Sequence, residues 1–146
     1  MVVVAKTKTP AHEAQQFFFE IGMQTRQLVV ASLSELGLTF PLAHALRLLE
    51  PGHPRPMSEL AELLVCDASN VTALADRLES KGLAERQPHP GDRRVKALAL
   101  TEDGIELRER VLELMSEPPP PIAALSVSDQ RALRDILRRA VEIQRG

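Results

Sequence analysis

Apolar residues recur every three to four positions along much of the chain, which is the spacing of one face of an α-helix. Between residues 11 and 36 this pattern is unbroken by proline and contains a single glycine, Gly22. It predicts one helix of about 39 Å, at a rise of about 1.5 Å per residue. That length is large for a chain of this size, so we expect part of the helix to pack against something outside one compact chain.

Shorter helices are predicted wherever a capping residue precedes an apolar stripe. In chain order they are a helix after Thr39 that Pro51-Gly52 stops, a short helix after Ser58, a helix after Asp67 or Ser69 that runs to about Lys81-Gly82, a helix after Thr101 that runs to about Ser116, and a last helix after Ser126.

The stretch from residue 84 to residue 100 has a different pattern, in which 84–87 and 94–100 read as paired strands. Pro, Gly and Asp are concentrated between them, which predicts a loop at 88–93. Leu98 and Leu100 are two positions apart, so both are expected to face the core. Three segments are predicted without regular structure: a flexible tail at 1–10, a stiff connector at 53–56 and a rigid extended spacer at 118–121.

Composition narrows the class of protein. At 146 residues, 44% of them hydrophobic, the chain is long enough to bury a core as one domain. No stretch approaches the roughly 20 apolar residues of a membrane span, and the apolar run at residues 2–4 is too short for a signal peptide. We therefore expect no membrane association and a cytoplasmic location. Trp and Tyr are absent, which argues against binding single strands by base stacking.

The overall charge hides a local basic patch. The chain has 18 Lys and Arg against 20 Asp and Glu, a net charge of −2, which is the wrong sign for general binding of polyanions. Between residues 86 and 96, however, four basic residues accompany a single acidic one. Such a patch favours docking in one orientation, although charge alone fits a solvated basic loop equally well. The residues are Arg86, Asp92, Arg93, Arg94 and Lys96.

Two short helices followed by a hairpin with an arginine-rich tip form the layout of a winged helix-turn-helix, so DNA is the first candidate partner. The predicted helix at 68–80 has one apolar face and one polar face. In this motif the second helix enters the major groove, where Asn pairs with adenine and Ser or Thr bond to bases or phosphates. The same polar face also fits an ordinary exposed helix surface. The residues expected to contact DNA from this helix are Ser69, Asn70, Thr72, Ala73 and Arg77.

Five short motifs follow one another over about 30 residues: Asp76-Arg77-Leu78-Glu79, Lys81-Gly82-Leu83, Glu85-Arg86, Gly91-Asp92-Arg93-Arg94 and Leu98-Ala99-Leu100-Thr101-Glu102-Asp103-Gly104. In order and spacing they resemble the multiple-antibiotic-resistance regulator (MarR) family of bacterial repressors. Leu36-Gly37-Leu38-Thr39 and Leu125-Ser126 extend the resemblance over most of the chain.

The resemblance implies a mainly α-helical fold with a small β-hairpin. It implies that residues 37–100 form a winged helix-turn-helix DNA-binding region within one domain. It also implies a homodimer in which the flanking helical regions, 11–36 and 101–146, interlock with those of the partner.

The resemblance further implies that the wing enters the minor groove, where negative potential attracts an arginine. Arg94, tethered by Asp92, or its neighbour Arg93 is the expected inserted residue. Arg86 and Lys96 would then lie near phosphates.

Two positions depart from the common family pattern. Ala68 and Ala73 stand where many relatives carry a long basic or polar side chain that faces DNA. The helix at 68–80 also has one basic residue against two acidic ones. We therefore expect affinity to depend more on the wing than on this helix, with sequence read through Ser69, Asn70 and Thr72.

Other chemistry has little support in the sequence. Cys66 is the single cysteine, and we expect it to be a small buried apolar residue rather than a redox sensor, because relatives that sense peroxide place the thiol near the start of the first helix. The four histidines have no metal-ligand spacing, and no catalytic motif is present, so we expect neither an enzyme nor a cofactor.

The expected function is a homodimeric, sequence-specific transcriptional regulator, more typically a repressor. Its DNA partner would be a pseudo-palindromic duplex with half-sites roughly 34–36 Å apart. A small-molecule effector could shift the spacing of the two recognition helices, and the residues considered for its pocket are Phe18, Met23, Arg26 and His44. The alternative is a winged-helix dimer that acts mainly as a protein-interaction module with weak or lost DNA binding.

Overall fold

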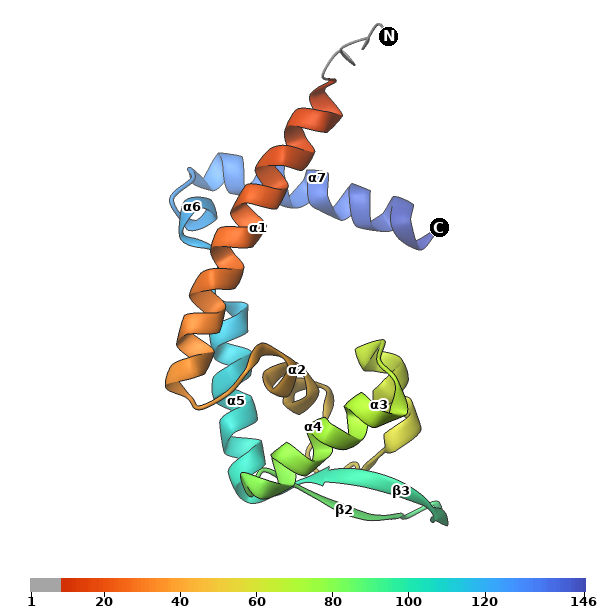
Figure 1. Cartoon of the computed structure of the whole chain (residues 1–146). Coiled ribbons are helices and arrows are strands. Elements are labelled where there is room, and N and C mark those ends of the chain that lie inside the picture. Colours follow the sequence, from red (N-terminus) through yellow and green to blue (C-terminus); the bar gives the residue numbers. More distant parts are fainter. Residues whose placement is uncertain (1–8) are drawn as a thin grey trace, which may run out of the picture. The chain divides into compact units, whose positions relative to one another are not determined.

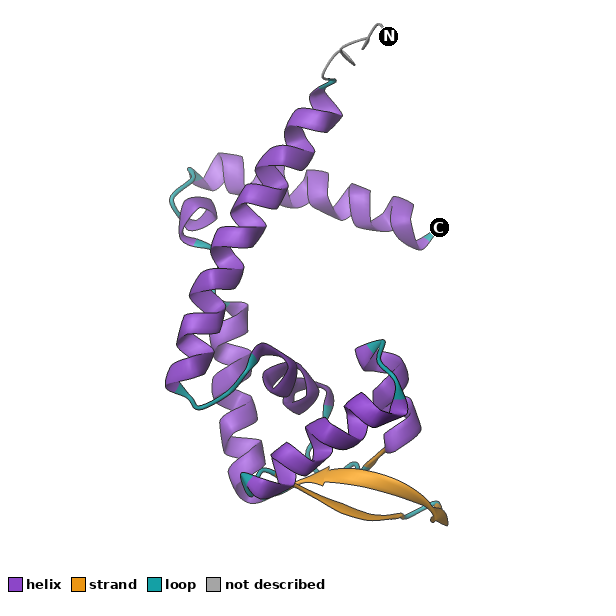
Figure 2. Cartoon of the chain, in the orientation of Figure 1, coloured by secondary structure: helices purple, strands orange, loops and turns teal. Residues whose placement is uncertain are grey.

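The computed structural model describes residues 9–146, so residues 1–8 of the expected flexible tail lie outside the described residues, and a helix already begins at Pro10. The chain is mainly helical with a small antiparallel sheet, as predicted (Figures 1 and 2). The helices are α1 (Pro10–Glu35), α2 (Phe40–Leu48), α3 (Met57–Leu64), α4 (Ala68–Ser80), α5 (Glu102–Ser116), α6 (Pro120–Ala123) and α7 (Val127–Arg145). The strands are β1 (Arg55–Pro56), β2 (Ala84–His89) and β3 (Asp92–Leu100).

The chain divides into two compact units. One contains the described residues as far as Arg26 together with Glu117–Gly146, and the other contains Gln27–Ser116. The second unit holds α2–α5, the sheet and the C-terminal part of α1. It therefore contains the whole of the helix-turn-helix and the hairpin.

Capping side chains start three helices of the second unit where the sequence predicts, the third being α5, which Thr101 caps. Thr39 Oγ1 accepts the backbone N–H of Leu42 at 3.4 Å, which starts α2. Asp67 Oδ1 accepts the backbone N–H of Asn70 at 2.8 Å, which starts α4. Because each bond satisfies a donor that the first helical turn leaves unpaired, the helices begin at fixed positions.

A short strand, β1, occupies part of the stiff connector expected at residues 53–56. It pairs antiparallel with the inner end of β3. Because this pairing holds the chain extended through Pro56, α3 begins at Met57 without a side-chain cap. The cap predicted at Ser58 is therefore wrong, and Ser58 lies inside the first turn.

The hairpin is longer and its turn tighter than the sequence predicts. β2 runs to His89 and β3 starts at Asp92, so the expected loop at 88–93 shrinks to Pro90-Gly91. A register shift at Pro88/His89 lets the strands pair again at the tip. The sheet order is β1-β3-β2, and β2 packs along α4 (Figure 1).

Leucine side chains dominate the core of the second unit. They come from α1 to α4 and from β3, whereas α5 contributes Val111. Burying each such side chain contributes about 1.5–3 kcal/mol. Leu100, which was expected to face the core, packs at its edge and is only partly buried. The largest fully buried side chains are Leu33, Leu42, Leu46, Leu49, Leu60, Val71, Leu78, Leu98 and Val111.

The proline run in the first unit is not the extended spacer that was expected. Pro119 is the N-cap of α6, and Pro120 and Pro121 form its first turn, where the fixed φ of proline suits a helix. Ser126 Oγ accepts the backbone N–H of Asp129 at 3.1 Å, so the predicted cap of α7 is confirmed.

No single helix within residues 9–146 combines the length and apolar character needed to cross a membrane. α1 and α2 pass such a test only when taken together, and they are bent by 82° relative to each other.

Four elements of the second unit meet at Leu83, in what we call the Leu83 junction (Gly82, Leu83, Thr101 and Gly104). Gly82 ends the α4 turn with φ of +70°, and the carbonyl oxygen of Leu83 accepts the N–H of Thr101 at 3.1 Å. Thr101 Oγ1 donates to the Gly82 carbonyl at 2.6 Å and accepts the N–H of Gly104 at 3.1 Å. A Cβ at residue 104 would lie 1.9 Å from the Leu83 oxygen, so only glycine fits there.

We expect Gly104→Ala to lower the free energy of unfolding by about 1–3 kcal/mol, as overpacking does, even though alanine is the better helix former. Urea unfolding followed by circular dichroism measures this change. Glu106→Ala, at an exposed position of the same helix, is the matched control and should stay within about 0.5 kcal/mol of the parent. A Gly104→Ala protein as stable as the parent would contradict the close packing at the junction.

Candidate nucleic-acid interface

The start of α4 is fixed by Asp67. Its Oδ1 accepts the N–H of Asn70 and the hydroxyl of Ser69, both at 2.8 Å. The bond from Asn70 and then that from Ser69 lower the pKa of Asp67, so the cap is an anion at a helix N-terminus, where the helix dipole favours negative charge.

The five residues predicted to contact DNA from α4 are all exposed, because the buried face of the helix lies elsewhere, at Val71, Ala75 and Leu78. Thr72 Oγ1 donates to the carbonyl of Ala68 at 2.8 Å, and the Ser69 hydroxyl donates a hydrogen bond to Asp67. Both hydroxyls therefore offer acceptor lone pairs outward. Asn70 keeps a side-chain amide with both a donor and an acceptor.

The wing carries its cations at the tip of the hairpin. Asp92 accepts the backbone N–H of Arg94 at 3.1 Å and its Nε–H at 3.2 Å, so the tether expected between these residues is present. These bonds, that of the side chain first, lower the pKa of Asp92. The Arg94 side chain is nevertheless 90% exposed. Arg93 and Lys96 are also exposed, and neither forms an ion pair within residues 9–146.

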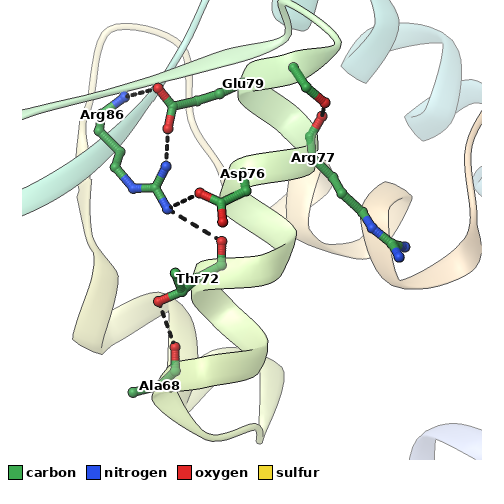
Figure 3. Close-up of polar contacts among 7 residues, drawn as sticks. Ala68, Thr72, Asp76, Arg77, Glu79 and Arg86 are labelled. Carbon is green, nitrogen blue, oxygen red and sulfur yellow. Dashed lines mark hydrogen bonds and ion pairs between the residues drawn. The ribbon is translucent and has the colours of Figure 1, made fainter.

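Arg86 lies in a different environment. Its guanidinium reaches from β2 to α4 and bonds Asp76, Glu79 and the carbonyl of Thr72 (Figure 3). The Asp76 contact is 2.7 Å and the Thr72 contact 3.3 Å, and only 25% of the side chain is exposed. Hydrogen bonding to Asp76, and then to Glu79, raises the pKa of Arg86 above its ordinary value. Arg77 extends from the opposite side of α4 (Figure 3).

A groove of about 500 Å³ lies between α2, the α3–α4 turn and α4. Its walls are mostly apolar, and its polar side chains include those of His44, Asn70 and Arg77. Asn70, Ala73 and Arg77 are also among the residues predicted to contact DNA. The groove was not predicted, because its lining comes from segments up to 37 positions apart. The complete lining is Phe40, Pro41, His44, Leu64, Cys66, Asn70, Ala73, Leu74 and Arg77.

Of the four residues considered for an effector pocket, His44 lines this groove. Phe18, Met23 and Arg26 lie on the part of α1 that belongs to the other unit. Cys66, which the sequence predicts as a small buried apolar residue, is only partly buried and lines the groove. The reason is that it follows Val65, which leaves the helix in a left-handed conformation with φ of 50° and turns the chain toward α4.

The described residues contain no group of three or more His, Cys, Asp or Glu side chains placed to hold a metal ion. The four histidines, His12, His44, His53 and His89, lie in different segments of the chain.

Comparison with known proteins identifies the family. The MarR family profile matches residues 38–96. The organic hydroperoxide resistance transcriptional regulator of Bacillus subtilis is 30% identical over 104 residues, which cover 71% of this chain and 68% of that protein. The chain belongs to the MarR family. The transcriptional repressor MdtR of Bacillus subtilis is 37% identical over 84 residues, 58% of this MarR-family chain and 54% of that protein. These relatives are transcriptional regulators.

Solved structures share the MarR fold. A variant of MepR from S. aureus superposes with a TM-score of 0.78 at 22% identity, over 89% of this chain and 97% of that one. Another MepR variant, bound to an oligodeoxyribonucleotide, gives 0.65 at 23% identity over 90% and 97%. CouR from Rhodococcus jostii, bound to p-coumaroyl-CoA, gives 0.71 at 24% identity over 90% and 94%.

The fold shifts the pKa of one residue that lines the groove, His44. Its ring is stacked on Phe40, with centroids 6.3 Å apart, and Arg47 Nη2 lies 3.2 Å from its Nδ1. Burial, and then the charge of Arg47, lower the pKa of His44 below 6.5. The neutral ring is therefore favoured in the folded state.

As the pH falls, His44 is protonated at a higher pH in the unfolded chain than in the folded one. The stability that is present above pH 6.5 should therefore be lost as the pH falls toward the folded-state pKa. We expect the parent to lose more free energy of unfolding than His44→Gln between about pH 7.5 and about pH 5.5. Urea titrations of both proteins at the two pH values measure the difference. Equal losses would show that the fold does not perturb His44.

Proposed function

We propose that this chain is a homodimeric, sequence-specific regulator of transcription that binds double-stranded DNA and acts as a repressor. The observation that carries the proposal is the exposed cation set of the wing, Arg93, Arg94 and Lys96, on a hairpin whose strand β2 packs against α4, a helix that also has an exposed polar face. A winged helix-turn-helix uses these two surfaces for the minor and major grooves. The complex of the MepR variant with an oligodeoxyribonucleotide supports the same use of the fold.

Exposed apolar side chains support the homodimer. Within residues 9–146 no residue of α7 is buried, yet Ile136, Leu137 and Val141 form an apolar stripe that is 40–53% exposed. Three consecutive phenylalanines of α1, at positions 17–19, are at least 64% exposed. Apolar surface on this scale is characteristic of an interface. Sedimentation equilibrium that gave a monomer at micromolar concentration would contradict the dimer.

The dimer sets the form of the DNA site. Two symmetry-related α4 helices would read a pseudo-palindromic duplex with half-sites roughly 34–36 Å apart. The rival, a winged-helix dimer that mainly binds proteins, predicts no specific binding even at low salt. Selection of bound fragments from a genomic library, repeated at two salt concentrations, separates the two.

On a duplex obtained in this way, Arg94→Ala should weaken binding at least about tenfold, because a charge-assisted contact contributes about 1.5–3 kcal/mol. Thr72→Ala should cost less, because its hydroxyl is already bonded to Ala68. Gel shifts at fixed salt measure both. Arg145→Ala removes the same charge from the end of α7 and serves as the control. Equal losses for Arg94→Ala and Thr72→Ala would contradict the dominant role of the wing.

We further propose that a small-molecule effector releases the DNA by binding the groove between α2 and α4. Its volume and apolar walls suit a small ligand. Asn70, Ala73 and Arg77 belong both to the groove and to the face of α4 proposed to meet DNA, so occupancy would act on that helix directly. The complex of CouR with p-coumaroyl-CoA supports ligand binding on this fold. A ligand shifts the equilibrium only by the difference in its affinity for the two states.

The single cysteine offers a probe of this coupling, because Cys66 lines the groove. Alkylation with N-ethylmaleimide places an apolar adduct there, and we expect the labelled protein to bind the selected duplex more weakly than the unlabelled one. Fluorescence anisotropy measures the affinity, and Cys66→Ser treated with the same reagent is the control. Full labelling without loss of affinity would separate the groove from DNA binding.

A further inference from the structure

We propose that Arg86 is a positioning residue for DNA binding: it locks the wing to the recognition helix and neutralises the acidic edge of that helix, in place of the phosphate contact expected from sequence. The inference rests on the DNA binding proposed above. Its starting point is the contrast between Arg86, with 25% of its side chain exposed, and Arg94, with 90% exposed.

The contacts of Arg86 span about two turns of α4. Thr72, Asp76 and Glu79 follow at intervals of four and three residues, so they lie on one side of the helix. The guanidinium bonds all three, and the backbone N–H of Arg86 adds a contact to Glu79 Oε2 at 3.5 Å. A planar guanidinium with fixed donors suits such a multiple contact, whereas an ammonium does not. β2 is therefore held to α4 along much of the helix and not at a single point.

This attachment bears on the wing because Arg86 lies near the root of the hairpin. Three residues after it, His89 pairs with Asp92 at the tip. A change in the angle between β2 and α4 at Arg86 would be magnified at Arg93 and Arg94. The lock thus sets where the wing cations lie when α4 is in the major groove.

The same contacts offset the negative charge of the two carboxylates of α4. Within the helix, Asp76 and Glu79 oppose a single arginine, Arg77, which points to the other side (Figure 3). Asp76 has 63% of its side chain exposed, so its carboxylate would face phosphates at close range. Arg86 places a positive charge 2.7 Å from Asp76 and also contacts Glu79. The polar face of α4 can then approach a polyanion without an unpaired carboxylate.

The experiment compares the affinities of three variants for the selected duplex. Arg86→Gln removes the lock and should weaken binding at least about tenfold, because truncating one member of a charge network leaves the others unpaired. The triple variant Arg86→Gln/Asp76→Asn/Glu79→Gln leaves no unpaired carboxylate and should recover most of that loss. Arg86→Lys keeps the charge without the planar fork and should recover only part of it.

A charge-matched control isolates the specific contacts. Arg86→Gln/Glu85→Gln/Glu62→Gln has the same net charge as the first triple variant, but its neutralised carboxylates are exposed and form no hydrogen bond or ion pair with Arg86. It should bind as weakly as Arg86→Gln. Hydroxyl-radical footprinting at saturating protein adds a positional readout: protection by the wing should be lost in Arg86→Gln and return in the first triple variant. Free energies of unfolding show whether each variant is folded; if Arg86→Gln is not, the comparison of the two triple variants with Arg86→Lys decides.

The outcomes separate this inference from the proposed function. Arg86 as a phosphate ligand predicts that the first triple variant stays as weak as Arg86→Gln, and that result would overturn the positioning role. Equal recovery in the two triple variants would reduce the effect to net charge and would also overturn it. A parent protein that binds no duplex would instead refute the proposed function, and the positioning role with it.

Discussion

The Leu83 junction is the constraint on which the second unit depends. The end of α4, the start of β2, the end of β3 and the start of α5 converge there, and a single carbonyl oxygen both accepts the Thr101 N–H and leaves no space for a side chain at residue 104. Because these contacts join the first and last elements of the hairpin, they close the strands on themselves at one end. The opposite end is free to carry a compact turn with cations. The wing is thus a projection from a tightly packed root.

Charge is divided between two arginines of the same hairpin according to exposure. Arg94 forms an ion pair with one carboxylate, that of Asp92, and its side chain remains exposed to solvent. A negative potential stronger than that of one carboxylate can therefore separate the Arg94 guanidinium from Asp92. Arg86 is bonded to two carboxylates and a carbonyl and is mostly covered. The net charge of −2 conceals this arrangement, because charges that neutralise each other on α4 count the same as charges on a remote surface.

Local signals in the sequence predict most of the fold. Thr39, Asp67 and Ser126 each bond a backbone N–H within three residues, so the chain itself contains both partners and the helix starts follow. β1 escapes prediction because two residues, one of them a proline, carry no periodicity, and its pairing with β3 is a contact between distant segments. The failed cap at Ser58 has the same origin.

The candidate site divides along the same line. The Asp92–Arg94 tether spans two residues and could be predicted, together with the exposed face of α4. The partners of Arg86 lie up to 14 positions away and depend on the packing of β2 against α4. The groove depends on the left-handed turn at Val65 and on the placing of α2, neither of which has a strong sequence signal. Thus the sequence predicts where cations lie along the chain, whereas folding decides which remain available.

The sharing of Asn70, Ala73 and Arg77 between the groove and the outer face of α4 has an evolutionary consequence. In a regulator with separate surfaces, operator preference and inducer preference can drift independently. Under the function proposed above, a substitution that retunes one also alters the wall of the other, so the two specificities would have to change together. Engineering a new operator preference by exchanging α4 would then bring with it a new inducer response.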